Sequence, residues 1–165
     1  METTYFDKTG KENTEETLKL AKKAAEEEGI DTLVLASTTG YTAEKAIGIC
    51  QGLKLIVVGI GRDDFPKELI EKLEKQGAKV YFSDEEDYDY PQDMQTAFRR
   101  FSQGTKVSIE NAVIATKENA LEPGKKVVSL AGTHWGADTA LVVRAAKEFN
   151  DIVVEELICK PRQPE

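Results

Sequence analysis

The chain has 165 residues, of which 40% are hydrophobic, and a formal net charge of −8. This length and composition predict one domain over residues 1–165 with a hydrophobic core of its own. The excess of acids over Lys and Arg argues against a nucleic acid or an anionic membrane as a partner, because such partners are recognised by a basic face.

The location of the protein is predicted from what its sequence lacks. No apolar run approaches the roughly 20 residues needed to span a bilayer. The first residues have neither the basic region nor the apolar region of a signal peptide. Cys50 and Cys159 lie far apart, each on an apolar pattern, as is typical of reduced, buried thiols. The sequence therefore predicts a cytoplasmic protein.

The amino-terminal part predicts a helix that leads into a buried strand. Tyr5-Phe6 is a short apolar pair that we expect as an edge strand or a docked terminus. Asn13 and Glu16 have the spacing of a capping box, which predicts a helix from there to Gly29. Residues 33–36 follow as a strand buried on both faces.

The loop after this strand combines hydroxyl side chains with one glycine, in the order Ser37, Thr38, Thr39, Gly40, Tyr41 and Thr42. A helical pattern begins directly after it, so the unpaired N–H groups and the positive dipole end of that helix would lie beside the hydroxyls. The loop therefore predicts a phosphate cradle without a lysine. The sequence contains no GxxxxGK[ST] motif, which argues against a P-loop nucleotidase.

The next elements predict a parallel sheet. Residues 53–60 form a nearly continuous apolar run, a helix is expected from Pro66 to Gly77, and residues 78–83 form a third strand. This βαβαβ succession is typical of a right-handed parallel sheet. Arg62 is expected to pair with Asp63 or Asp64, with contact to an anion as the alternative.

The acidic run over residues 84–90 is expected to be a solvated, partly mobile loop rather than a cation site, because it lacks the pattern of a calcium loop. A helix follows from Pro91 to a stop at Gly104, with Arg99 and Arg100 facing outward. A further helix ends near Asn119.

A second loop follows a buried strand over residues 126–131. This loop contains Gly132, Thr133, His134, Trp135, Gly136, Ala137, Asp138 and Thr139. Backbone N–H groups beside its glycines can approach an anion closely. Ligands of open α/β sheets bind where parallel strands end. The two loops therefore predict two halves of one ligand site.

The carboxyl-terminal part predicts two more strands. Residues 139–146 are ambiguous between helix and strand, and their β-branched pair favours a strand. Residues 152–159 form the last strand.

The two loops resemble those of the carboxyl-terminal α/β domain of pyruvate kinase over residues 31–145, and most closely those of small stand-alone archaeal proteins similar to that domain. Pyruvate kinase has Thr-Lys-Ser-Gly, a variable residue, Ser/Thr and Ala in the first loop, where residues 37–43 read Ser-Thr-Thr-Gly-Tyr-Thr-Ala. Its second loop has Gly-Trp and a later Gly-Ser, where residues 132–137 read Gly-Thr-His-Trp-Gly-Ala. Thr38 in place of the lysine and the displaced Trp135 argue against a doubly phosphorylated sugar.

This resemblance implies a three-layer α/β/α sandwich with a mostly parallel, mixed sheet of about five strands, of which the fifth, residues 139–145, is antiparallel. In pyruvate kinases the two loops form an allosteric sugar-phosphate site. In the stand-alone group the same pocket is associated with flavin mononucleotide (FMN). The resemblance therefore implies FMN as the cofactor and a small phosphorylated molecule as the partner.

The leading hypothesis is a pocket for one phosphate and one flat ring. Residues 37–42 would hold the phosphate, with Gly136, Ala137, Asp138 and Thr139 closing over it. His134, Trp135 or Tyr41 would lie along the isoalloxazine ring. For Asp138, a contact to a ribityl hydroxyl and a local Asx turn both stay open.

Two further functions stay open: a non-catalytic regulatory module that binds a sugar phosphate, and a flavin-dependent oxidoreductase. Pyruvate kinase activity is not expected, because its chemistry takes place in a separate barrel domain of roughly 250 residues for which this chain has no room. The sequence contains no nucleophile–base spacing, no paired carboxylates and no metal-ligand cluster. No catalytic residue or metal ligand is therefore assigned, Glu110 and Asn111 are left outside the site, and association into a homo-oligomer stays open.

Overall fold

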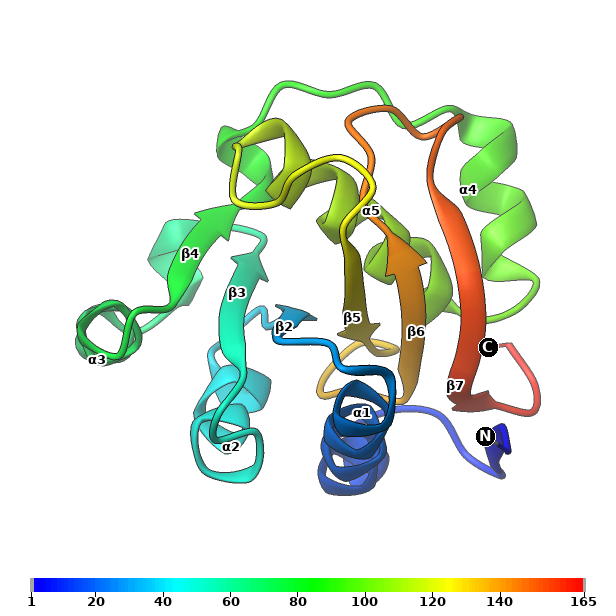
Figure 1. Cartoon of the computed structure of the whole chain (residues 1–165), viewed down its shortest axis with the longest axis horizontal. Helices are drawn as coiled ribbons and strands as arrows, with labels where there is room; N and C mark the ends of the chain where they lie inside the picture. The colour runs from blue at the N-terminus through cyan, green and yellow to red at the C-terminus, as the bar shows by residue number, and fades with distance from the viewer. Residues whose placement is uncertain (1, 165) are drawn as a thin grey trace.

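A mixed seven-stranded sheet forms the middle of the computed structural model, which describes residues 2–164 (Figure 1). Its strands are β1 (Thr4–Phe6), β2 (Thr32–Ala36), β3 (Lys54–Gly59), β4 (Lys79–Phe82), β5 (Lys126–Ala131), β6 (Thr139–Arg144) and β7 (Val153–Pro161). Their order in space is β1-β7-β6-β5-β2-β3-β4. The sheet has more strands than the five implied by the resemblance. The strand expected over residues 152–159 is confirmed as β7 and the edge strand at Tyr5-Phe6 as β1, and both extend the sheet beyond β6.

Strand direction changes once on each side of β6. The four strands β5, β2, β3 and β4 are parallel to one another. Strand β6 is antiparallel to both β5 and β7. The expected antiparallel strand near residues 139–145 is therefore confirmed, as is the strand interpretation of this ambiguous segment.

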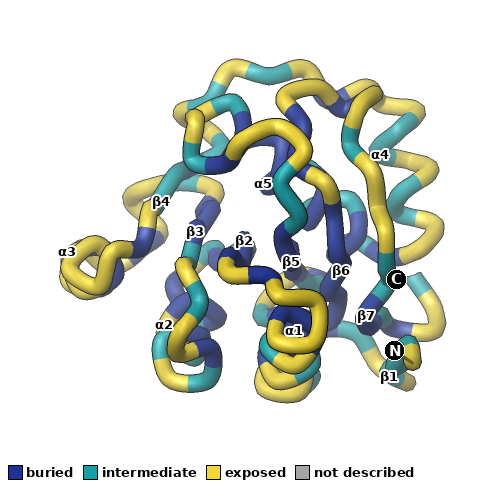
Figure 2. Tube along the Cα trace, viewed as in Figure 1, coloured by how far each residue is buried: buried dark blue, intermediate teal, exposed yellow. Residues whose placement is uncertain are grey.

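Helices cover both faces of the sheet, which confirms the three-layer architecture (Figure 1). On one face lie α1 (Thr14–Glu28), α2 (Tyr41–Ile49) and α3 (Lys67–Lys75), and on the other lie α4 (Gln92–Arg99) and α5 (Gln103–Lys117). Successive residues of a strand point to opposite faces. Accordingly, Leu33 and Leu35 of β2 belong to the core under α1 and α2, whereas Val34 belongs to the core under α5. Figure 2 shows the buried residues concentrated in the strands and on the inner sides of the helices.

Both cysteines belong to the core under α1, as expected. Cys50 and Cys159 are buried and unpaired with each other. Burial raises the pKa of the Cys50 thiol to about 11 and that of Cys159 to about 12. Both side chains therefore act as small apolar groups rather than as nucleophiles.

The start of α1 differs from the prediction. Asn13 occupies the N-cap position, but its side chain makes no capping hydrogen bond. Its amide instead donates to the carbonyl of Lys8 at 2.7 Å, because a short 3-10 turn over Lys11–Asn13 precedes the helix. The predicted capping box is therefore wrong. The predicted helix end at Gly29 is confirmed, since Gly29 adopts a left-handed φ of 68°.

The position of the break between α4 and α5 also differs from the prediction. Gly104 was expected to end a helix but lies in the first turn of α5, where Ser102 is the N-cap and its Oγ accepts the Thr105 N–H at 3.0 Å. The absence of a side chain at Gly104 lets α5 approach β6 closely. A Cβ atom there would lie 2.5 Å from Thr139 Oγ1 and 3.1 Å from the Ala131 carbonyl oxygen.

We expect Gly104→Ala to lower the free energy of unfolding by about 1–3 kcal/mol, because α5 must move away from a packed strand. Gly48→Ala is the matched control, since Gly48 lies in α2 and a Cβ there has no neighbour within 4 Å. That variant should gain up to about 1 kcal/mol from helix propensity. Urea denaturation followed by circular dichroism measures both, and equal stabilities would contradict the close approach.

The acidic segment between β4 and α4 is anchored by aromatic side chains. Tyr90 is buried and stacks on Phe149 with ring centroids 4.0 Å apart, and its hydroxyl donates to the Lys106 carbonyl at 2.9 Å. Asp84, Glu85, Asp87 and Asp89 are exposed, as expected for a solvated loop, whereas its end is attached to the core at Tyr90. Arg62 pairs with Glu85 of this segment at 3.0 Å rather than with Asp63 or Asp64.

Candidate functional site

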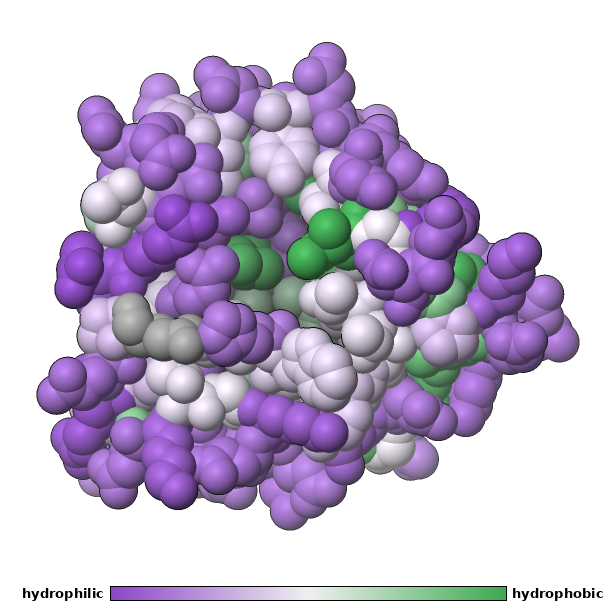
Figure 3. Space-filling model, turned by 180° about the vertical axis from the view of Figure 1, so that it is seen from behind, coloured by the Kyte–Doolittle hydropathy of each residue, from purple (hydrophilic) through white to green (hydrophobic). Residues whose placement is uncertain are grey.

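A cavity of about 750 Å³ lies where β2, β3 and β5 end. The chain leaves β2 towards β3 on one side and later returns to place β5 on the other side of β2. Such a topological switch point is where open α/β sheets bind ligands, and the volume suits a small molecule. Figure 3, seen from behind, shows a hollow near the centre of the molecule, with hydrophobic side chains in it and hydrophilic ones around it.

The first predicted loop forms one wall of this cavity. The lining residues from this loop are Ser37, Thr38, Thr39, Tyr41 and Thr42. Gly40 is the N-cap residue of α2, and Ser37 Oγ accepts the Ala43 N–H of the first turn at 3.2 Å. Within residues 2–164, no acceptor is found for the N–H groups of Tyr41 and Thr42. The first turn of α2 therefore retains free donors at the cavity.

The second predicted loop faces the first across the cavity. Its lining residues are Gly132, Thr133, His134, Trp135 and Gly136. His134 adopts a left-handed φ of 61°, and Trp135 is 57% exposed at the rim. The Lys11 ammonium lies 4.5 Å from the Tyr41 ring centroid and 5.4 Å from that of Trp135, so it links the two loops through cation–π contacts.

Four predicted site residues do not line the cavity: Gly40, Ala137, Asp138 and Thr139. Asp138 is fully buried, where Oδ2 accepts the Gly10 N–H at 2.8 Å and Oδ1 accepts the Thr139 hydroxyl at 2.9 Å. The Ala137 N–H donates to Thr14 Oγ1 at 3.0 Å. Contrary to the prediction, residues 137–139 do not close over the cavity, because these contacts attach the loop to the amino-terminal segment.

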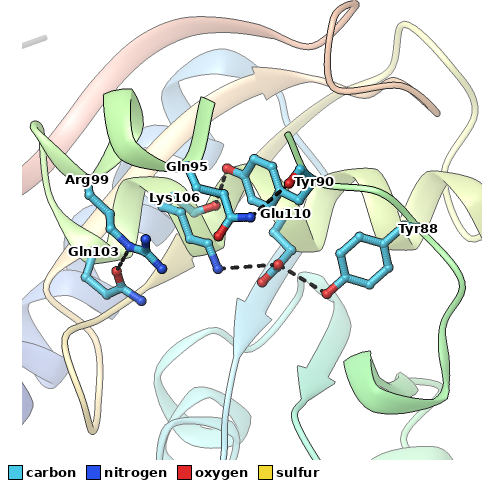
Figure 4. Close-up of polar contacts among 7 residues, drawn as sticks. All are labelled: Tyr88, Tyr90, Gln95, Arg99, Gln103, Lys106 and Glu110. Atoms are coloured by element: carbon cyan, nitrogen blue, oxygen red, sulfur yellow. Dashed lines mark hydrogen bonds and ion pairs between the residues drawn. The ribbon is translucent and has the colours of Figure 1, made fainter. Parts of the chain in front are cut away.

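A third wall was missed from the sequence. It consists of side chains from α4, α5 and the segment before them, namely Tyr88, Arg99, Gln103, Lys106, Val107, Glu110 and Asn111. Figure 4 shows polar contacts in and behind this wall. Arg99, expected to face outward, therefore lies at the cavity.

The signal for this wall was present in the sequence. Gln103, Lys106 and Glu110 are spaced i, i+3 and i+7, which places them along one side of an otherwise buried helix. A polar stripe on such a helix indicates a cavity beside it.

The centre of this wall is a paired cation and carboxylate. Lys106 Nζ lies 3.4 Å from Glu110 Oε2, and both side chains are largely buried. The Tyr88 hydroxyl donates to the same carboxylate oxygen at 3.1 Å (Figure 4). Burial and the adjacent Glu110 raise the pKa of Tyr88 to about 12. The phenol therefore stays protonated near neutral pH and acts as a hydrogen-bond donor.

Glu86, in the same acidic segment, makes stability depend on pH. Burial first, and then the neighbouring Glu118, raise the pKa of Glu86 from 4.5 to about 7. A raised carboxyl pKa stabilises the fold below pH 4.5, and this contribution is lost as the pH rises through about 7.

We expect the melting temperature to fall between pH 5 and pH 8, and Glu86→Gln to flatten this fall. The exposed Glu71 on α3 provides the control Glu71→Gln, which should leave the profile unchanged. Scanning calorimetry across this pH range measures the profiles. A wild-type slope in Glu86→Gln would contradict the assignment.

Two negative findings concern the described residues alone. Among residues 2–164, no group of three or more His, Cys, Asp or Glu side chains is placed to hold a metal ion. In the same range, no helix is long and apolar enough to cross a membrane.

Comparison with known proteins identifies the fold. No protein-family model matches the chain. The chain is similar to Cryptosporidium parvum pyruvate kinase in complex with ADP, with a TM-score of 0.52 and 16% identity, covering 81% of this chain and 24% of that one. A second pyruvate kinase structure from this organism has a TM-score of 0.51 and 16% identity, and the match covers 81% of this chain and 23% of that one.

This chain therefore spans about a quarter of the length of those pyruvate kinases. The likeness, together with the mixed sheet between two helical layers, confirms the expected fold, that of a pyruvate kinase carboxyl-terminal-like domain.

Proposed function

We propose that this chain, which has the fold of a pyruvate kinase carboxyl-terminal-like domain, binds FMN in the cavity between the β2 and β5 loops. The observation that carries this proposal is the pair of free N–H groups of Tyr41 and Thr42, which open from a helix N-terminus into a cavity with aromatic residues at its rim. FMN has one phosphate and one flat ring system, and the cavity offers a complementary group for each.

The phosphate would bind at the start of α2. The free N–H groups of Tyr41 and Thr42 would donate to an anion there, and the helix dipole favours negative charge. The hydroxyls of Thr38, Thr39 and Thr42 supply further donors on the same wall. This cradle has no lysine, so binding would rest on backbone donors and hydroxyls.

The ring system would lie against the apolar and aromatic part of the lining. Val58, Ile60 and Val107 provide apolar surface in the cavity. Tyr41 and Trp135 provide aromatic faces at the rim, on which a flat ring stacks well. The Tyr88 hydroxyl and the Lys106–Glu110 pair offer polar partners for ring nitrogen and oxygen atoms.

Titration of flavin-free protein with FMN and with riboflavin, followed by flavin fluorescence, tests the proposal. The two ligands share the ring and differ by the phosphate. We expect FMN to bind at least about tenfold more tightly, because charge-assisted hydrogen bonds at α2 are worth more than 1 kcal/mol each. Equal affinities, or no FMN binding, would contradict the proposal.

Two further measurements, titration with a sugar phosphate and an assay with a reduced nicotinamide, separate the other two functions. A chain that does not bind FMN but binds a sugar phosphate would be the non-catalytic regulatory module. A chain that binds FMN and also oxidises a reduced nicotinamide would be the flavin-dependent oxidoreductase.

A further inference from the structure

We propose that Arg99, oriented by Gln103, is a second anion-binding position in the cavity, which takes the carboxylate or phosphate of a small molecule bound beside the flavin. This inference rests on the proposed function, because FMN would occupy the α2 position. It identifies a second ligand by its chemistry, an organic acid or a phosphate ester.

Arg99 has unused donors at the cavity. Its Nε–H donates to Gln103 Oε1 at 2.9 Å, which fixes the plane of the guanidinium (Figure 4). None of the residues that the structure describes accepts a hydrogen bond from its two terminal NH₂ groups, and none offers a carboxylate within ion-pair distance. A planar guanidinium with two free NH₂ groups binds carboxylate or phosphate through paired hydrogen bonds.

The charges of the lining single out Arg99. The lysine and arginine side chains that line the cavity in the described chain are Arg99 and Lys106. Lys106 is compensated by Glu110 at 3.4 Å, with both side chains at most 14% exposed. Arg99 has the neutral Gln103 as its partner instead. The net positive charge of this wall therefore lies at Arg99.

A second polar group on α5 is also free. Asn111 is 3% exposed and lines the cavity, yet its side-chain amide bonds to no residue in the range 2–164. Its amide atoms are not among the fully enclosed side-chain atoms that lack a partner in the described residues, so they are accessible from the cavity and can bond to a ligand there. Asn111 follows Gln103 by eight residues, about 12 Å along the helix. The wall therefore offers polar contacts over a length greater than one phosphate needs.

FMN leaves Arg99 available. Its single phosphate would be bound at the first turn of α2, on a different wall from Arg99, by the free N–H groups of Tyr41 and Thr42. Its isoalloxazine ring is uncharged in the oxidised state, so it does not supply the counter-charge that Arg99 lacks. Arg99 therefore suits a separate anionic molecule.

Calorimetric titration of the FMN-loaded protein with malonate and with inorganic phosphate tests this inference, using Arg99→Met, Gln103→Glu and the control Arg100→Met. Arg100 is the exposed neighbour of Arg99 and does not line the cavity. Gln103→Glu keeps the side-chain shape but gives Arg99 a carboxylate partner. We expect wild type and Arg100→Met to bind the same anion equally, and the other two variants to bind it at least about tenfold more weakly while retaining FMN.

The outcomes separate the inference from the proposed function. Preference for malonate or for phosphate identifies which anion the position takes. Wild-type affinity in Arg99→Met would overturn the inference, and so would loss of FMN from that variant, since Arg99 would then bind the flavin phosphate itself. If wild-type protein holds no FMN, the same titrations on the flavin-free protein still show whether Arg99 binds an anion. In that case, anion binding that depends on Arg99 supports the anion position, although the FMN proposal fails. If no such anion binding is found, the anion position and the FMN proposal are both overturned.

Discussion

Gly136→Ala is expected to lower the free energy of unfolding by about 2–5 kcal/mol and to abolish FMN retention. Gly136 has a left-handed φ of 73°, and a Cβ atom there would overlap Thr14 Oγ1 and lie 2.7 Å from Lys11 Cα. Thr14 cannot move aside freely, because its hydroxyl donates to the Lys11 carbonyl and accepts the Ala137 N–H. The expected loss combines the cost of a left-handed alanine with that of overpacking.

Gly52→Ala is the matched control for this variant. Gly52 has a φ of 91°, but a Cβ there has no neighbour within 4 Å. It should therefore lose only the backbone cost of about 1–2 kcal/mol and keep FMN. Chemical denaturation and the flavin-to-protein absorbance ratio measure both variants. Similar losses in the two would show that the contact between this loop and the segment over residues 11–14 is unimportant.

Asp138→Ala is expected to lower the free energy of unfolding by about 3 kcal/mol. The buried carboxylate accepts the Gly10 N–H at 2.8 Å and the Thr139 hydroxyl at 2.9 Å, and its removal leaves both donors with one partner fewer. Hydrogen bonds to charged groups contribute about 1.5–3 kcal/mol each. Because Gly10 precedes Lys11, the variant should also loosen the Lys11 contact with Tyr41 and Trp135.

Urea denaturation measures the expected loss of stability in Asp138→Ala, and hydrogen exchange of the Gly10 amide measures the expected loosening of the amino-terminal segment. Asp151→Ala, at an exposed turn, is the control and should change stability by less than about 0.5 kcal/mol. An unchanged exchange rate at Gly10 in Asp138→Ala would refute the role assigned to this carboxylate.

The layered fold could be predicted because its signals are local. Strands β2, β3 and β5 are short apolar runs followed by helices or glycine loops, and buried parallel strands have this pattern. Two walls of the cavity followed from the same signals, because strand ends on one edge of a parallel sheet meet in space. The resemblance implied about five strands, whereas the local patterns at residues 5–6 and 152–159 correctly indicated the two additional strands, β1 and β7.

The role of Asp138 and the position of Arg99 depend on contacts between separate segments, whereas the polar stripe of α5 was visible in the sequence and was not used. Gly10 and Asp138 are 128 residues apart, so no local pattern indicates that this loop carboxylate is buried. Gly104 was misinterpreted for a similar reason, because its small size is required by Thr139 across the layer rather than by the end of a helix. Arg99 lies at the cavity because α4 ends there and Gln103 at the start of α5 orients it.

The visible absorption spectrum of the natively purified protein, recorded before any ligand is added, tests the central claim most directly. The account predicts flavin bands that are lost on denaturation, with FMN recovered in the released fraction. A colourless protein that also takes up no added FMN would contradict the assignment of the cavity between the β2 and β5 loops to this cofactor.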